Sequence, residues 1–385
     1  MSFKILIVDD EPDVELLIRQ RFRRKIRDGE FEFEFALNGQ EALDKLAADH
    51  AIDIVMSDIN MPVMDGLTLL SRLTTMDRIL RTVIVSAYGD MQNLRIAMNR
   101  GAYDFLTKPI DFEDFETTVY KTIQEINGIK AGYQARQQLS AIQNELSVAN
   151  RIQQSILPRT FPPFPERHEF EIYAEMTAAR EVGGDFYDFF FIDDTHLGFV
   201  IGDVSGKGVP AAIFMAVSRT LLRATAMQGV TAAQCLEYVN RVLVKQSDTA
   251  MFVTVFYGIL DTTSGDVDYC IAGHNPPYVF SSKGIRPIDE PRNMVAGLFD
   301  GSKYVGGTLH LEAGDGILLY TDGVPEANDA QENEYTEERL ERTLEAAREA
   351  SVQDVVSRLL ADVRVFTAQA PQSDDITALA MRFLG

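Results

Sequence analysis

The first 126 residues alternate short apolar runs with amphipathic stretches, and this alternation limits the fold more than any other feature of the chain. Four of the five runs are mostly apolar, as expected for strands covered on both faces of a sheet. The second run alternates phenylalanine with glutamate and therefore has one solvated face. We expect a doubly wound α/β domain with strand order 2-1-3-4-5, because that order places the second strand at an edge. The predicted strands cover residues 3–8, 31–36, 52–57, 82–86 and 104–107.

Polar residues follow the predicted strands at their carboxyl ends, where a doubly wound sheet binds its ligand. Asp9 and Asp10 follow the first strand and Asp58 the third, while Ser86 and Lys108 stand at the ends of the fourth and fifth. Three neighbouring carboxylates repel one another unless a cation neutralises them, and carboxylate oxygens suit Mg²⁺. The spacing therefore predicts a magnesium site with a lysine beside it.

This region resembles the CheY-like response-regulator receiver domain, which has a flavodoxin-like fold. The matching motifs are Val8-Asp9-Asp10-Glu11-Pro12, the stretch from Ser57 to Gly66, Ser86-Ala87 and Lys108-Pro109. The resemblance implies that Asp58 accepts a phosphoryl group from a sensor histidine kinase. It also implies that Mg²⁺ is held by Asp10, Asp58 and the Asn60 carbonyl, with Asp9 contributing through water.

The resemblance assigns three further receiver residues. Ser86 and Lys108 would contact the phosphoryl oxygens, and Phe105 occupies the position of the switch aromatic. It also implies a cis peptide bond between Lys108 and Pro109.

Residues 112–156 contain no proline and almost no strand signal, so we expect a long polar helix. Its apolar residues recur at alternating steps of three and four, with Gln153 in one seam position, as in a coiled coil. We expect a homodimer through this helix; the alternative is a single helix whose apolar face rests on a neighbouring domain. The seam residues are Leu139, Ile142, Leu146, Ala149 and Ile156.

Beyond Pro158 and a proline-rich connector, strands and helices follow in an order that indicates an α+β domain with antiparallel sheets. We predict strands at residues 197–204, 252–260, 267–272, 316–321 and 376–382. We predict helices at residues 209–228, 232–245, 337–350 and 352–366.

Four acidic motifs in this half each lie at a strand end or in a glycine-rich turn. Ligand sets made only of oxygen favour Mg²⁺ or Mn²⁺ over zinc. Two such ions, bridged by a carboxylate, can activate a water for attack on a phosphate. The sequence shows no competing cysteine nucleophile or serine–histidine pair. The motifs contain Asp185, Asp203, Asp322, Asp374 and Asp375.

This half resembles the PPM family of metal-dependent serine/threonine protein phosphatases, in its SpoIIE/RsbU-like branch. The likeness starts with the linker motif from Ala149 to Pro158. It implies two stacked antiparallel sheets flanked by helices, and two Mn²⁺ or Mg²⁺ ions. In this resemblance Asp203 bridges both ions and the Val204 carbonyl binds one of them. The remaining ligands would be Asp185, Asp322 and Asp374.

Four further residues would support this site. Asp375 would hold the metal ligands in place rather than bind directly. Arg180 has the spacing from Asp185 of the family's phosphate-binding arginine, with a surface salt bridge as the alternative. His274 and Asn275 would shape the substrate face; the alternative for His274 is a turn residue that hydrogen-bonds to the backbone.

The formal net charge of −22 opposes binding to nucleic acid or to an anionic membrane surface, so we expect neither partner. The apolar N-terminal run is too short for a signal sequence or a membrane span. Cys235 and Cys270 are too few for a disulfide framework. We therefore expect a cytoplasmic protein.

The sequence thus predicts a receiver at residues 1–125, a helical linker at 126–158 and a phosphatase at 159–385. Phosphorylation of Asp58 would gate hydrolysis of a phosphorylated anti-sigma-factor antagonist of the STAS type. The alternative is a non-catalytic adaptor in a sigma-factor pathway, but such adaptors have lost the metal ligands that this chain retains.

Overall fold

The structure is a computed structural model that describes residues 3–246, 250–368 and 370–385. It divides into two compact units, Met1–Ile142 and Gln143–Gly385. The long helix α6 (Phe112–Ile156) begins in the first unit and ends in the second, as the sequence predicts. Within the described residues, no helix has both the length and the apolar character needed to cross a membrane.

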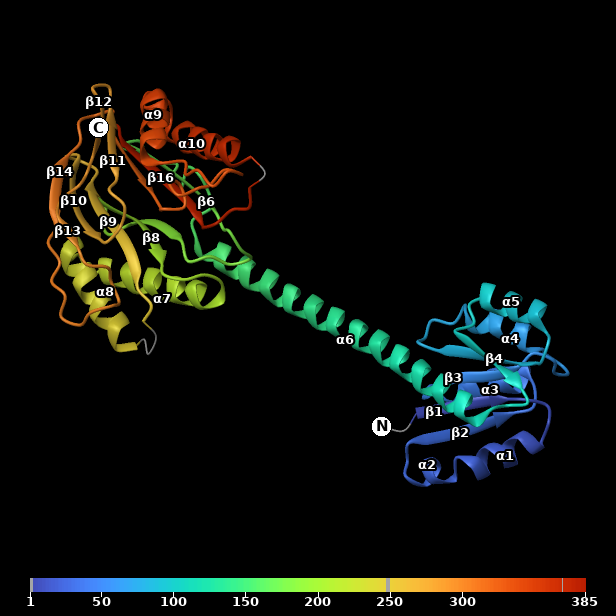
Figure 1. Cartoon of the computed structure of the whole chain (residues 1–385). Helices are drawn as coiled ribbons and strands as arrows, with labels where there is room; N and C mark the ends of the chain where they lie inside the picture. The colour runs from blue at the N-terminus through green and yellow to red at the C-terminus, as the bar shows by residue number, and fades with distance from the viewer. Residues whose placement is uncertain (1–2, 247–249, 369) are drawn as a thin grey trace. The chain divides into compact units, whose positions relative to one another are not determined.

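The first unit is built on a five-stranded parallel sheet in the order β2-β1-β3-β4-β5, which confirms the predicted doubly wound fold (Figure 1). Each strand lies within two residues of its predicted position. The strands are β1 (Phe3–Val8), β2 (Phe31–Ala36), β3 (Ile52–Asp58), β4 (Arg81–Ala87) and β5 (Asp104–Lys108).

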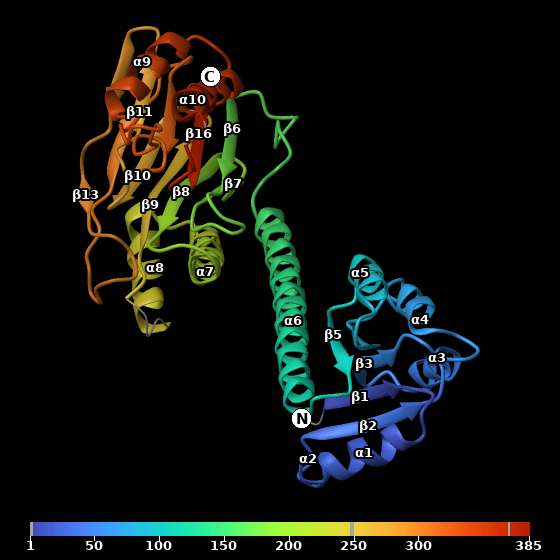
Figure 2. The same ribbon diagram turned by 45° about the vertical axis from the view of Figure 1, so that its right-hand side comes forward.

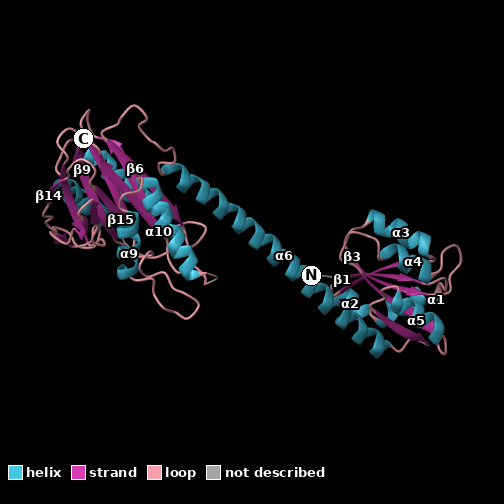
Figure 3. Cartoon of the chain, turned by 90° about the horizontal axis from the view of Figure 1, so that it is seen from above, coloured by secondary structure: helices cyan, strands magenta, loops and turns pink. Residues whose placement is uncertain are grey.

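Helices cover both faces of this sheet because alternate strand residues point to opposite sides. Ile5 and Ile7 share a core with α1 (Asp13–Arg21) and the start of α6. Leu6 and Val8 pack instead with α3 (Gly39–Ala48) and α4 (Gly66–Leu73). The remaining helices of this unit are α2 (Arg23–Arg27) and α5 (Met91–Asn99). Figure 3 shows this sheet with helices on either side.

The second unit contains two sheets, both almost entirely antiparallel (Figure 2). The larger has the order β13-β10-β9-β8-β7, with β14 paired to β10, and the smaller has the order β12-β11-β15-β16-β6. The larger-sheet strands are β7 (Phe186–Phe191), β8 (His196–Val204), β9 (Val253–Asp261), β10 (Asp266–Ala272), β13 (Arg292–Asn293) and β14 (Gly307–His310). The smaller-sheet strands are β6 (Phe170–Thr177), β11 (Tyr278–Ser281), β12 (Gly284–Pro287), β15 (Gly316–Tyr320) and β16 (Ile376–Phe383).

The two sheets stack face to face and are flanked by helices. One core joins the inner faces of both sheets and extends to α7 (Val209–Ala226) and α8 (Ala232–Gln246). A second core lies between the outer face of the smaller sheet and α9 (Glu337–Ala347) with α10 (Val352–Thr367). Sheet edges and turns are thereby fixed on a rigid framework, which can hold side chains in defined positions.

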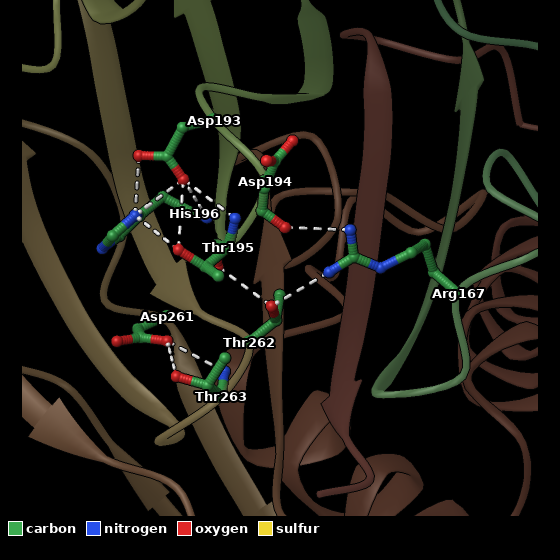
Figure 4. Close-up of polar contacts among 8 residues, drawn as sticks. All are labelled: Arg167, Asp193, Asp194, Thr195, His196, Asp261, Thr262 and Thr263. Atoms are coloured by element: carbon green, nitrogen blue, oxygen red, sulfur yellow. Dashed lines mark hydrogen bonds and ion pairs between the residues drawn. The ribbon is translucent and has the colours of Figure 1, made fainter.

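The β7–β8 and β9–β10 turns of the larger sheet are joined by a network of polar contacts (Figure 4). Thr262 donates hydrogen bonds to the Thr195 carbonyl from its backbone nitrogen and its hydroxyl. Arg167 donates to the Asp194 carbonyl and the Thr262 hydroxyl. None of the predicted site residues belongs to this network, so we interpret it as a structural contact that stabilises the two turns against each other.

The end of α6 packs against the second unit. Gln153 is buried there: its Nε2 donates to the Gly183 carbonyl at 2.6 Å, and the Gly183 nitrogen donates to its Oε1 at 3.1 Å. The nitrogen and the oxygen of the Gln153 amide are thus both hydrogen-bonded to the backbone of a loop in the same unit. Leu139 and Ile142, earlier on the predicted seam, are 57% and 54% exposed.

Candidate functional sites

The acidic residues of the first unit meet at the carboxyl ends of the parallel strands. Lys108 Nζ lies 2.6 Å from Asp58 Oδ2 and 2.9 Å from Asp9 Oδ2. Carboxylate oxygens of Asp9, Asp10 and Asp58 lie within 4.8 Å of one another. The structure thus brings these four predicted site residues together, and their oxygens form a donor set that suits Mg²⁺.

Lys108 is the main counter-charge of this pocket. Burial alone would lower the pKa of Lys108, but its contacts with Asp58 and Asp9 outweigh burial and raise that pKa. Burial raises the pKa of Asp9, an effect that hydrogen bonds from the Glu11 nitrogen and Lys108 oppose. The lysine therefore stays charged beside two nearly buried carboxylates.

The remaining predicted residues of this site differ in their exposure. Ser86 is buried, and its hydroxyl has no hydrogen-bond partner among the described residues. Phe105 is 42% exposed and Asn60 is exposed. The Lys108–Pro109 peptide bond is cis, which confirms that expectation.

The second acidic site is assembled from both sheets of the second unit. Asp185 directly precedes β7, and Asp203 lies near the end of β8 in the larger sheet. Asp322 follows β15, and Asp374 and Asp375 precede β16 in the smaller sheet. Residues far apart in the sequence are thus brought close enough for the charges of their carboxylates to act on one another.

Asp185 is oriented by two threonine hydroxyls. Thr321 Oγ1 donates to Asp185 Oδ2 at 2.7 Å, and Thr377 Oγ1 donates to the same oxygen at 2.5 Å. The three side chains are fully or almost fully buried. Because Thr377 lies on β16 and Thr321 directly follows β15, these two bonds connect Asp185 to the smaller sheet.

Asp375 holds the loop that leads to Asp185. Its carboxylate accepts hydrogen bonds from the backbone nitrogens of Ala179 at 2.8 Å, Gly184 at 2.7 Å and Asp185 at 3.4 Å. A Cβ atom on Gly183 would lie 2.1 Å from Asp375 Oδ2, so only glycine leaves room for this contact. The side chain is thus occupied by backbone donors.

Burial and mutual repulsion make this group of carboxylates unfavourable when it is fully charged. Burial, followed by repulsion from Asp203 and Asp375, raises the pKa of Asp185 well above its usual range. Burial and the charge of Asp322 raise the pKa of Asp203 to about 7. The pKa of Asp322 is also raised, by burial and by Asp374. Divalent cations relieve such repulsion, so the donor set fits Mg²⁺ or Mn²⁺.

The carboxylates of the second unit spread more widely than those of the first. Among the described residues, Asp9, Asp10 and Asp58 form the one group with three ligand atoms within 4.8 Å. One ion could not contact all the phosphatase carboxylates in this arrangement. A Cβ atom on Gly184 would lie 2.8 Å from the Val204 carbonyl oxygen, so that oxygen faces the loop of Asp185.

The supporting residues take different positions. A Cβ atom on Gly208 would lie 4.0 Å from Arg180 Nη1, so Arg180 reaches the loop that follows β8; its side chain makes no ion pair within the described residues. His274 is buried, and burial lowers its pKa to about 4. Its Nδ1 lies 2.9 Å from the hydroxyl of Thr254, a strand partner of Asp203. Asn275 is half-buried.

Sequence reasoning missed the contacts that orient these ligands. Thr321 and Thr377 stand beside the aspartates of two acidic motifs, one residue before Asp322 and two after Asp375. Their position beside the aspartates in two strand-end motifs was the available signal. Gln153 stands in a heptad seam, and no pattern in the sequence distinguishes its backbone contacts from a coiled-coil position.

Two family models match the chain. The model for the response regulator receiver domain matches residues 5–120, and the model for stage II sporulation protein E (SpoIIE) matches residues 193–384. These two regions contain the receiver pocket and most of the second acidic site.

Curated relatives and a solved structure agree. The phosphoserine phosphatase RsbU of Bacillus subtilis is 30% identical over 266 residues, which cover 68% of this chain and 77% of RsbU. Protein IcfG of Synechocystis is 31% identical over 266 residues, or 62% of this chain, and the match spans 41% of the length of IcfG. The SiaA-PP2C domain of Pseudomonas aeruginosa has the same fold, with a TM-score of 0.56, 20% identity and coverage of 64% of this chain and 98% of that domain.

The matches agree with the geometry of both sites: a parallel sheet with an acidic pocket, and two stacked sheets with buried and half-buried aspartates at their strand ends. The chain belongs to the RsbU- and SpoIIE-like family of PPM-type serine/threonine phosphatases, and its phosphatase domain is joined to a response-regulator receiver domain.

Proposed function

We propose that the chain is a response regulator whose phosphatase output is gated by phosphorylation of Asp58. The observation that carries this proposal is the pair of acidic sites in two separate units, each with its own charge-balancing and orienting residues. A site whose ligands are already oriented by buried hydrogen bonds loses little entropy when the reaction begins.

In the receiver, Asp58 is the nucleophile that takes the phosphoryl group from a sensor histidine kinase. Lys108 neutralises charge at Asp58, and the unpaired Ser86 hydroxyl is a donor for a phosphoryl oxygen. Asp9, Asp10, Asp58 and the Asn60 carbonyl would hold Mg²⁺. Transfer would place added negative charge beside the lysine and change the packing near Phe105.

In the phosphatase, Asp203 and the Val204 carbonyl would share two Mn²⁺ or Mg²⁺ ions with Asp185, Asp322 and Asp374. When bound, such ions lower the pKa of water and stabilise charge on the phosphate. Thr321 and Thr377 hold Asp185 ready for this role, and Asp375 fixes its loop. Arg180 would contact the oxygens of the substrate phosphate.

Helix α6 supplies a physical route between the sites. The side-chain amide of Gln153 on this helix makes two hydrogen bonds with the backbone of Gly183, two residues before Asp185. A displacement of the helix would therefore move the loop that leads to Asp185. We propose that two copies of the chain pair through the seam that includes Leu139 and Ile142, and that receiver phosphorylation alters this pairing. Both side chains are more than half exposed within the described chain.

The proposed substrate is phosphoserine or phosphothreonine on an anti-sigma-factor antagonist of the STAS type. This proposal rests on the resemblance to the RsbU-like branch and on the presence of all the metal-ligand positions.

The test is the rate of phosphate-ester hydrolysis by the full chain in Mn²⁺, with and without beryllofluoride as a phosphoryl mimic. We expect metal-dependent hydrolysis whose rate changes with the mimic. Asp203→Ala should abolish it, and Asp58→Ala should keep basal hydrolysis but lose the response. Asp300→Ala, in an exposed turn, is the matched control for removal of an aspartate. Absence of hydrolysis of both a phosphopeptide and a chromogenic ester would favour the adaptor.

A further inference from the structure

Lys207 is the basic residue in direct contact with the phosphatase carboxylates. It lies in the loop between β8 and α7, four residues after Asp203. Its Nζ lies 2.7 Å from Asp374 Oδ2 and donates to the Ser373 carbonyl at 2.6 Å. Among the described residues, this is the one ion pair made by the five aspartates of the site.

The contact occupies one oxygen of a carboxylate that a divalent ion would use. The Asp375 nitrogen donates to Asp374 Oδ1 at 2.8 Å, while Lys207 holds Oδ2. Both oxygens of Asp374 therefore have a partner. An ion could bind this carboxylate through Oδ2 only by displacing the lysine ammonium or by sharing the oxygen with it.

The charge of Lys207 acts on the rest of the cluster as well. It opposes the rise in the pKa of Asp322 that burial and Asp374 cause, and it does the same at Glu326, where burial and Asp322 raise the pKa. One lysine thus neutralises part of the charge that a divalent cation would neutralise.

The position of Lys207 is unfavourable for a purely structural lysine. It lies two residues before Val209, at the amino end of the 18-residue helix α7, where the helix dipole disfavours a positive charge. Gly206 and Gly208 on either side have φ angles of 90° and 76°, in the left-handed region that glycine adopts readily. Lysine is long and flexible, so it can leave the carboxylate without moving the fold.

We propose that Lys207 is a built-in competitor for the divalent metal at Asp374. In the metal-free site its ammonium balances the carboxylates, and metal binding displaces it. Displacement leaves the Lys207 ammonium without its carboxylate partner, in the loop that follows the strand of Asp203. Metal affinity is then coupled to the position of the β8–α7 loop. This inference rests on the proposed metal site.

The test is Mn²⁺ binding by isothermal titration calorimetry, with the full chain carrying Asp10→Asn and Asp58→Asn to remove the receiver site. Lys207→Met should bind Mn²⁺ about two- to fivefold more tightly, the range expected for loss of a half-exposed ion pair. Lys207→Arg keeps the charge and should retain the affinity of the parent. Lys303→Met removes an exposed lysine paired with Glu237 elsewhere in the domain and should change nothing.

Thermal unfolding separates competition from a structural role. Lys207→Met should lower the melting temperature in EDTA but not in saturating Mn²⁺, because the bound metal has already displaced the lysine. Equal losses in both conditions, or unchanged or weaker Mn²⁺ binding, would overturn the inference. If the parent protein bound no Mn²⁺ and Asp203→Asn left the calorimetric signal unchanged, both the proposed metal site and this inference would be wrong.

Discussion

Replacing Asp375 with alanine removes the acceptor for three backbone nitrogens in the loop that leads to Asp185. The side chain is 7% exposed, so water replaces it poorly. An unsatisfied buried donor costs about 1–3 kcal/mol. The charge of Asp375 also repels Asp185 and Asp203 and raises their pKa values. Removing this charge relieves the repulsion and offsets part of the loss in stability. We expect a net loss of about 3 kcal/mol in the free energy of unfolding.

The measurement is differential scanning calorimetry of the full chain in EDTA. For a domain of this size, 1 kcal/mol shifts the melting temperature by about 2–4 °C, so Asp375→Ala should lower it by about 6–12 °C. Asp375→Asn keeps one acceptor oxygen, so its melting temperature should fall by about a third as much as that of Asp375→Ala. Asp300→Ala, which removes an acceptor for the Gly301 nitrogen in an exposed turn, should melt close to wild type. An alanine variant as stable as wild type, or an asparagine variant as damaged as alanine, would refute the reasoning.

Three further predictions follow from the same contacts. Thr377→Val removes one donor to Asp185, and because that bond favours the charged carboxylate, half-maximal activity should need about 3- to 10-fold more Mn²⁺. The pKa of Asp203 is raised to about 7, so the folded protein binds a proton there more tightly than the unfolded chain does. In EDTA the melting temperature should therefore fall as pH rises from about 5 to 8. Saturating Mn²⁺ should remove this dependence of the melting temperature on pH. Leu139→Asp with Leu146→Asp should convert a dimer to a monomer in sedimentation; monomers in both proteins would contradict the proposed pairing.

The receiver fold was predictable because its apolar runs and their polar ends carry the whole pattern. Strands β1 and β2 match their predicted residues, and the long helix α6 begins and ends where expected. The parallel order also followed, because β2 alternates buried and more exposed residues as an edge strand does.

The phosphatase was less predictable because its smaller strands carry weak patterns. Strands β11 and β12 have four residues each, and β13 has two, too few to show an alternation. Motif spacing gave candidates for the ligands, but the threonines that orient Asp185 lie on β16 and directly after β15, and their contact with Asp185 depends on how the two sheets stack. The Gln153–Gly183 contact was hidden for the same reason: it joins residues that only tertiary packing brings together.

The hydrogen bonds to Asp185 have a consequence for synthesis. Thr377 lies 192 residues after Asp185 in the sequence, and Asp375 lies 190 residues after it. A nascent chain on the ribosome therefore exposes Asp185 and Asp203 long before their supports emerge. Until β16 has paired with β15 and β6, the metal-binding carboxylates of the incomplete chain are not held in position. Phosphatase activity should appear only after this strand leaves the exit tunnel, so a truncated product would not dephosphorylate proteins indiscriminately.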